Sequence, residues 1–275
     1  MRLFDSCIVG MTGHKVPKKE RLERNREAAE KLRSLLVNPE SSRKIIIDCS
    51  FGHIMTDFEK TSLAVQIQQC YSHLRQHPDH TVMHVVSVDE GLSERIRKQG
   101  GSEWVMQSTS ELLESVIADA KERVIIMSPD ADEELSGDDV MQPNNIFVIG
   151  GIVDRLVSRN ETAHKAIKLG LKSRRLPTDG DKFVNKVFNI DSVFDFLVRC
   201  FDLQTKPSRE ELVDLLIHVL PDRKKKDERT PPSKKTKQVI GAIVSNPCNQ
   251  IKLDAYRVLE LFQWMLLEES IRYHE

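Results

Sequence analysis

The most informative chemistry in this sequence lies at residues 146–154, where the apolar run IFVIGGIV ends in Asp154. A carboxylate at the end of a buried strand can accept or donate a proton, because apolar surroundings shift its pKa toward that task. Gly150 and Gly151 carry no side chains and therefore allow a ligand or another backbone to approach closely. An aspartate in this position also commonly caps a turn or a helix, and the spacing alone slightly favours that second interpretation.

Other familiar sites find no support in the sequence. It contains no GxxxxGK[ST] or GxGxxG phosphate-binding loop, and its five cysteines lack the CxxC spacing of zinc sites. His73, His77 and His80 flank a proline, and we expect them to be surface residues of a turn, because no acidic ligand completes a metal set. The acidic stretch 130–139 lacks the glycine and final glutamate of an EF-hand, which favours a solvated loop. We therefore predict no metal.

Apolar periodicity predicts the elements that must position these residues. Buried strands are predicted over 44–52, 80–88, 123–129 and 145–154. Amphipathic helices are predicted over 17–36, 60–76, 108–122, 162–171, 192–201, 210–220 and 253–266. Strands alternating with helices indicate βαβ units, so we predict an α/β fold with a mainly parallel sheet flanked by helices. In such a sheet ligands bind beyond the carboxyl ends of the strands, which is where Asp154 falls.

Composition indicates a soluble intracellular protein with balanced charge, since 41 Lys and Arg face 42 Asp and Glu. No apolar run approaches the roughly 20 residues that a membrane span needs, and the first ten residues do not resemble a secretory signal. We predict four parts: a basic arm over 1–42, a main domain over 43–222, a basic linker over 223–238 and a helical extension over 239–275. Basic segments on a neutral chain suit RNA binding by arms, although solvated faces or linkers have the same composition.

Four blocks in the same order give the sequence a family resemblance. They are IIIDCSF (45–51) with QIQQCYSHLR (66–75), RVIIMSPDADEEL (123–135), FVIGGIVDR (147–155), and a last block over 164–197 followed by HVLPDRK (218–224). In these blocks the chain resembles the tRNA purine-9 N1-methyltransferases, a branch of the SPOUT methyltransferases. The resemblance covers roughly residues 43–224 and implies a C-terminal trefoil knot, which periodicity alone does not predict.

The resemblance implies that the protein uses S-adenosyl-L-methionine to methylate N1 of the purine at position nine of tRNA. It places Asp154 at the active site as general base or orienter. Guanine N1 carries a proton that a base must remove, whereas adenine N1 has a free lone pair, so Asp154 would matter less for adenine. The segments expected to wrap the cofactor contain Met127, Gly151, Arg155, Leu156, Val157, Ser158, Arg159, Thr162, Leu176, Val187, Phe188 and Asn189.

Contacts to tRNA are expected from basic segments that bind phosphate without reading sequence, so that affinity falls steeply with salt. The candidates are Lys18, Lys19, Arg21, Arg24, Lys172, Arg174, Arg175, Arg223, Lys224 and Lys225. A buried tRNA nucleotide must also be exposed before it reacts.

Two departures from the family pattern keep a second hypothesis open. Leu156 stands where relatives often have Asn, and Ser128-Pro129-Asp130-Ala131 replaces Thr-Ala-Asp-Ser. The alternative is a tRNA-binding scaffold, or an RNase P-type subunit with protein partners, on the same fold. We expect a monomer located in the nucleus or cytoplasm, with the mitochondrion as the alternative, since no Arg- and Ser-rich transit peptide is evident.

Overall fold

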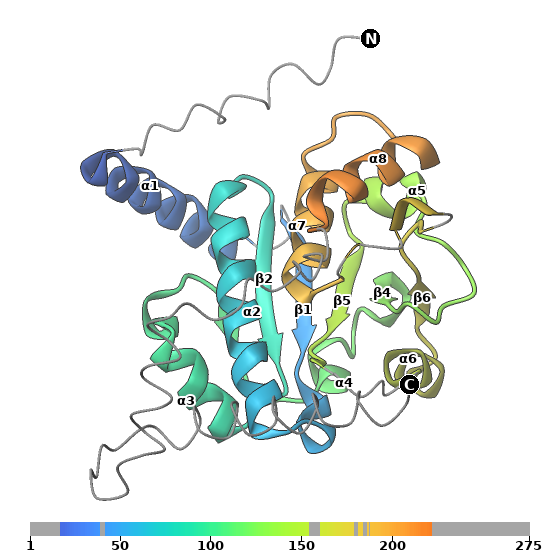
Figure 1. Cartoon of the computed structure of the whole chain (residues 1–275), viewed down its shortest axis with the longest axis horizontal. Helices are drawn as coiled ribbons and strands as arrows, with labels where there is room; N and C mark the ends of the chain where they lie inside the picture. The colour runs from blue at the N-terminus through green and yellow to red at the C-terminus, as the bar shows by residue number, and fades with distance from the viewer. Residues whose placement is uncertain are drawn as a thin grey trace, which may run out of the picture. The chain divides into compact units, whose positions relative to one another are not determined.

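The computed structural model describes residues 17–38, 42–153, 160–178, 181–183, 186 and 188–221. Its centre is a parallel sheet with the strand order β3-β2-β1-β5-β4-β6 (Figure 1). The strands are β1 (Arg43–Asp48), β2 (Thr81–Val86), β3 (Gln107–Ser108), β4 (Val124–Met127), β5 (Ile146–Gly150) and β6 (Lys172–Arg174). The predicted parallel α/β fold is confirmed, and each of the four predicted strands is present, although those predicted over 44–52 and 145–154 already end at Asp48 and Gly150. Strands β3 and β6 were not predicted.

Helices cover both faces of this sheet (Figure 1). They are α1 (Lys18–Val37), α2 (Asp57–Gln76), α3 (Glu90–Lys98), α4 (Leu113–Val116), α5 (Gly137–Met141), α6 (Glu161–Leu169), α7 (Ile190–Phe201) and α8 (Arg209–Val219). Short 3-10 turns occupy Ser50–Ile54, Gly101–Glu103, Lys121–Arg123 and Asp181–Phe183. The described helices include none that is both long and apolar enough to span a membrane.

The predicted helix over 108–122 is wrong in extent. Only α4 is α-helical there, with Leu113 and Ile117 supplying one helical repeat that packs on the sheet. The helix α6 ends as predicted at Gly170, whose φ of 65° is the left-handed conformation of a C-cap. The helix predicted over 253–266 lies outside the described residues, and the predicted knot and domain boundaries stay predictions.

Alternation along the strands produces two apolar layers. Ile45 and Ile47 of β1 face a large core formed with α2 and α7, while Ile46 faces a smaller core with α4 and α6. Both faces of a parallel sheet are usually covered, which explains why β1 reads as an unbroken run of isoleucines rather than an alternating pattern. Phe147 of β5 and Phe196 of α7 are fully buried in the larger core.

Two close contacts between a histidine and an aspartate side chain join α2 to α7 and to the residue that follows α7. His73 Nδ1 lies 3.3 Å from Asp195 Oδ1, and His77 Nδ1 lies 2.6 Å from Asp202 Oδ2. The sequence interpretation of these histidines as surface residues of a turn is therefore wrong for His73, which sits within α2 and is half-buried. It holds for His80, which is exposed.

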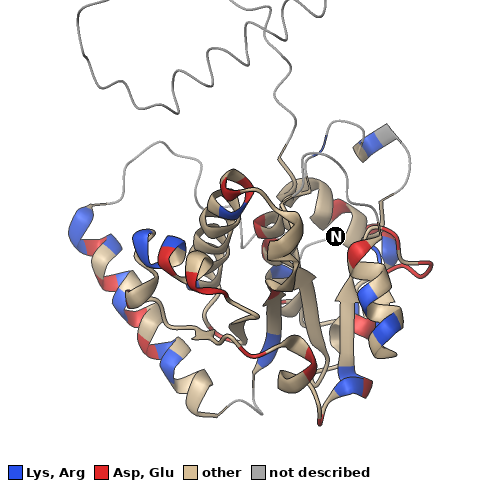
Figure 2. Cartoon of the chain, turned by 90° about the horizontal axis from the view of Figure 1, so that it is seen from below, with Lys and Arg blue, Asp and Glu red and all other residues tan. Residues whose placement is uncertain are grey.

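Charged residues of both signs occur along most of helix α1 (Figure 2). Its buried residues are Ala28 and Leu32, through which it packs beside β2 and α2. Lys31 forms an ion pair with Asp79, two residues before β2 begins. The helix therefore docks near the amino end of the sheet.

We predict that Asp195→Asn destabilises the protein in a pH-dependent way. Burial on its own raises the pKa of Asp195, but hydrogen bonding and ion pairing with His73 and Arg199 outweigh it and hold the pKa below its ordinary value. The stabilisation is therefore complete above the unfolded-state pKa of about 3.9 and is lost as the pH falls through the folded-state pKa. Urea unfolding should show a loss of about 1–3 kcal/mol near neutral pH.

The same measurement at about pH 3 should show a smaller difference between Asp195→Asn and the wild type. The exposed Asp214 on α8 offers a matched control, and Asp214→Asn should change stability by less than about 0.5 kcal/mol. An equal loss for Asp195→Asn at both pH values would contradict the assignment.

Candidate active site

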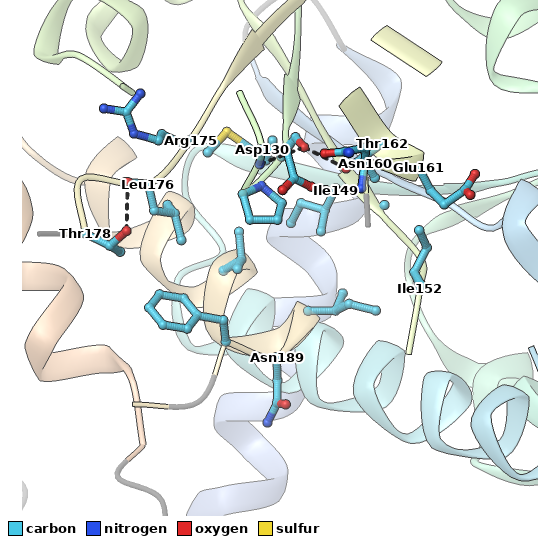
Figure 3. Close-up of a pocket in the computed structure, with 17 residues that line it drawn as sticks. Asp130, Ile149, Ile152, Asn160, Glu161, Thr162, Arg175, Leu176, Thr178 and Asn189 are labelled. Atoms are coloured by element: carbon cyan, nitrogen blue, oxygen red, sulfur yellow. Dashed lines mark hydrogen bonds between the residues drawn. The ribbon is translucent and has the colours of Figure 1, made fainter. Parts of the chain in front are cut away.

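A pocket of about 330 Å³ lies beyond the carboxyl ends of β4, β5 and β6 (Figure 3). This is the edge at which parallel sheets place ligands. Three of its walls are the turn after β4, the end of β5 with the start of α6, and the chain after β6, and the first turn of α7 closes it. The lining residues are Met127, Ser128, Pro129, Asp130, Ile149, Gly150, Ile152, Asn160, Glu161, Thr162, Arg175, Leu176, Thr178, Phe188, Asn189, Ile190 and Val193.

The structure brings several residues of the predicted cofactor segments to this pocket. Met127, Thr162, Leu176, Phe188 and Asn189 line it, although they are far apart in the sequence. Gly151 follows Gly150 of the lining, and its N–H donates a 2.8 Å hydrogen bond to the main-chain oxygen of Asp48. The predicted residues Asp154, Arg155, Leu156, Val157, Ser158, Arg159 and Val187 lie outside the described residues, so their roles stay predictions.

The polar side of the pocket was largely missed by sequence reasoning. Ser128, Asp130, Asn160 and Thr178 line it, and Asp130 had been assigned to a solvated acidic loop. Asp130 is indeed exposed, in the turn that follows β4, but this turn also borders the pocket. The available signal was position, since polar residues just after a buried parallel strand lie at the ligand-binding edge.

Hydrogen bonds connect these polar residues across three segments. Thr162 Oγ1 donates to Ser128 Oγ at 2.9 Å, and Ser128 N–H donates to the main-chain oxygen of Arg174 at 2.9 Å. The carboxylate of Asp130 accepts a 3.0 Å hydrogen bond from Asn160 N–H, at the entrance to α6 (Figure 3). Ser128 is itself buried, so its two hydrogen bonds are shielded from water and hold β4, β6 and α6 together.

Close approach between α6 and β5 depends on glycine. A Cβ atom on Gly150 would overlap Cγ2 of Thr162, and one on Gly151 would lie 2.9 Å from the main-chain oxygen of Asp48. The sequence prediction that this Gly-Gly pair permits a close backbone approach is therefore confirmed. The space that a side chain at Gly150 would take is filled by Thr162, in the first turn of α6.

The wall formed by α7 is fixed from α2. Gln66 Oε1 accepts a 2.9 Å hydrogen bond from Ile190 N–H, the first residue of α7. The first N–H groups of a helix have no partner within the helix, so a side-chain acceptor here fixes where α7 begins. Asn189 and Ile190 are thereby held at the pocket.

The buried cysteine nearest the site is not suited to nucleophilic chemistry. Cys49 is 4% exposed, and burial, with the nearby carboxylates of Asp48 and Asp89, raises the pKa of its thiol strongly. A thiol in such surroundings stays protonated, whereas reactive cysteines are thiolates. The described residues also contain no group of three or more His, Cys, Asp or Glu side chains placed to hold a metal.

The predicted RNA-binding residues near β6 differ in whether their charges are already paired with carboxylates of the protein. Arg174 pairs with Glu133 at 2.8 Å and with Asp139 at 3.0 Å. Burial acts to raise the pKa of Asp139, but hydrogen bonds from Ser136 and, after them, the Arg174 guanidinium hold it below its ordinary value. Arg175 pairs with Glu134 at 3.1 Å. Both arginines thus support the pocket wall, whereas Lys172 is exposed. Arg223, Lys224 and Lys225 lie outside the described residues.

On α1 the predicted RNA-binding residues are all exposed. Lys18, Lys19 and Arg21 lie in its first turn, and Arg24 forms a 3.1 Å ion pair with Glu20 one turn away. Exposed pairs of this kind contribute little to stability and are readily exchanged for another partner.

The six-stranded parallel sheet flanked by helices matches the fold of a solved protein. A crystal structure of full-length spTrm10 in complex with SAH aligns with a TM-score of 0.57 at 24% identity, covering 66% of this chain and 96% of that one. This likeness establishes the fold.

The sequence identifies the family. The model of the tRNA (guanine(9)-N(1))-methyltransferase TRM10/TRM10A family matches residues 11–225, so the chain belongs to this family. The tRNA (guanine(9)-N1)-methyltransferase of Kluyveromyces lactis is 26% identical over 76% of this chain and 71% of its own length. The enzyme of the same description from Debaryomyces hansenii is 30% identical over 74% of this chain, and the match spans only 57% of that protein.

We predict that Gly150→Ala destabilises the protein and that Thr162→Ser reverses most of the loss. The added methyl group overlaps Thr162 Cγ2, which Thr162→Ser removes while keeping the hydroxyl bonded to Ser128. Overpacking of this kind costs about 1–3 kcal/mol. Urea denaturation of both single variants and the double variant measures the coupling. Additive effects of the two substitutions would show that this contact does not determine how α6 packs.

Proposed function

We propose that this protein transfers a methyl group from S-adenosyl-L-methionine to N1 of the purine at position nine of tRNA, with guanine as the principal substrate. The proposal is supported by family membership over residues 11–225 and by relatives described as tRNA (guanine(9)-N1)-methyltransferases. The observation that carries it structurally is the pocket at the carboxyl edge, where five of the predicted cofactor-binding residues converge.

The pocket suits this cofactor in size and chemistry. Its volume of about 330 Å³ falls within the range of small-molecule sites. Apolar side chains on several sides, among them Met127, Ile149 and Leu176, can enclose the adenine ring, while Thr178 and Asn189 offer polar atoms to the rest of the molecule. When bound, S-adenosyl-L-methionine supplies an electrophilic methyl group on a positively charged sulfonium. The carboxylate of Asp130 favours such a positive charge.

The protein itself must remove the proton from guanine N1. Guanine N1 becomes a good nucleophile only when its proton is removed, and we assign that role to the carboxylate of Asp154. Positioned proton transfer is typically worth about 10²–10⁴ in rate. The segment that carries Asp154 joins β5 to α6, both of which border the pocket.

The enzyme is favoured over a catalytically inactive scaffold on the same fold. A scaffold has no need for a concave, partly apolar pocket with converging polar groups, which is typical of small-molecule sites. The replacement of Thr-Ala-Asp-Ser by Ser128-Pro129-Asp130-Ala131 keeps a hydroxyl and a carboxylate on the pocket wall, because both Ser128 and Asp130 line it.

The first test incubates the protein with S-adenosyl-L-methionine and unmodified tRNA transcripts bearing G or A at position nine. Mass spectrometry of digested RNA should show N1-methylguanosine, and Asp154→Asn should reduce its rate of formation by about 10²-fold or more. N1-methyladenosine formation, where present, should be less affected. The exposed Asp132 is a matched control, and Asp132→Asn should retain the activity. Absence of methylated purine with intact tRNA binding would favour the scaffold.

We further propose that the first turn of α1 binds tRNA phosphates. Changing Lys18, Lys19 and Arg21 together to Gln should lower tRNA affinity and flatten its dependence on salt, by a slope of about 0.7–0.9 for each phosphate that is no longer neutralised. Filter binding across a salt series measures this slope. A matched triple change at Lys98, Lys121 and Arg123, which are exposed outside α1, should leave the slope nearly unchanged. Equal effects of the two triple variants would indicate a contribution of net charge alone.

A further inference from the structure

Lys165 of α6 does not line the pocket, but its ammonium group is largely buried at the carboxyl end of β1. Its Nζ lies 2.7 Å from Asp48 Oδ2 and 2.9 Å from Ser50 Oγ. Only 13% of the Lys165 side chain and 2% of the Asp48 side chain are exposed. Ionised groups are costly to bury to this extent, so this pair differs from the exposed ion pairs elsewhere on the protein.

Asp48 connects four segments at the carboxyl edge. Its Oδ1 accepts hydrogen bonds from Ser50 N–H at 3.2 Å and from Ser87 Oγ at 3.1 Å. Its main-chain oxygen accepts from Gly151 N–H at 2.8 Å. With Lys165 added, one residue joins the turn after β1, the end of β2, the end of β5 and α6.

Lys165 is linked to the pocket through Thr162, which lies three residues earlier on α6. Residues at this spacing share one face of a helix, so an anchor at Lys165 sets the depth of Thr162. Thr162 lines the pocket, bonds Ser128 Oγ at 2.9 Å and packs against Gly150. Movement of α6 away from β1 would therefore open the wall that Thr162 forms.

The surroundings of Lys165 favour an indirect role over direct contact with a ligand. Besides Asp48, its Nζ lies 3.8 Å from Glu114 Oε1 and 5.6 Å from the centre of the Phe51 ring. Its charge is thus shared between two carboxylates and an aromatic face.

We propose that Lys165 is a positioning residue for the pocket, which seats α6 and Thr162 against the ends of β4 and β5 through its ion pair with Asp48. The inference rests on the proposed function, because affinity for S-adenosylhomocysteine is the quantity that reports the shape of the pocket.

Isothermal titration with S-adenosylhomocysteine tests the proposal on the full chain. Lys165→Met should weaken binding about tenfold at a temperature where circular dichroism shows the variant to be fully folded. Lys165→Arg, which keeps the charge, should stay within about threefold of the wild type. Lys168 is exposed on the same helix, and Lys168→Met should bind as the wild type does. A purely structural role would lower the unfolding temperature and leave the affinity unchanged, which would overturn the proposal.

A double-mutant cycle with Asp48→Asn separates positioning from direct contact. If Lys165 acts through Asp48, adding Lys165→Met to Asp48→Asn should change the affinity by less than about twofold, with all three variants similarly weakened. A full tenfold effect in the Asp48→Asn background would show that Lys165 acts independently of Asp48 and would overturn the proposal. The double variant removes both members of the buried pair with Asp48, so it decides the question if Lys165→Met alone fails to fold. A wild-type protein that binds no S-adenosylhomocysteine would instead refute the proposed function itself.

Discussion

The parallel register of β1 with β2 and β5 determines where each of these strands ends, and therefore where the loops that follow them begin. In this register Asp48 pairs with Val86 of β2 and with Gly150 of β5, so three strands end side by side. A slip of one residue would exchange the two faces of a strand and bury Asp48 in the wrong layer. The pocket, the Gly-Gly approach of α6 and the ion pair of Lys165 all require the observed alignment.

The parts of the fold that follow from local patterns were predictable. Ile45, Ile46 and Ile47 indicate a strand covered on both faces, and the spacing of apolar residues in α2 and α7 indicates helices. Once a parallel sheet is inferred, the position of Gly150 and Gly151 at a carboxyl end follows, and with it the edge at which a ligand binds. Family resemblance added the residues of the pocket wall that come from distant segments, such as Leu176 and Asn189.

The parts that escaped prediction depend on tertiary contacts. Strand β6 has the polar sequence Lys-Ser-Arg and shows no alternation of apolar residues, so only its pairing with β4 makes it a strand. Arg174 looked like a free cation because Glu133 and Asp139, its partners, are some forty residues away in the sequence. The burial of His73 was not predicted for the same reason, since its partner Asp195 lies on α7, far from it in the sequence.

The docking of α1 near the amino end of the sheet has a consequence for substrate choice. The pocket opens at the carboxyl end, so an RNA bound at both places must extend across the body of the protein. A short fragment containing the target purine could reach the mouth of the pocket but could not reach the helix. If α1 binds tRNA as proposed, the distance between α1 and the pocket would select for an RNA long enough to contact both. The protein would then distinguish a complete tRNA from its fragments by size rather than by sequence.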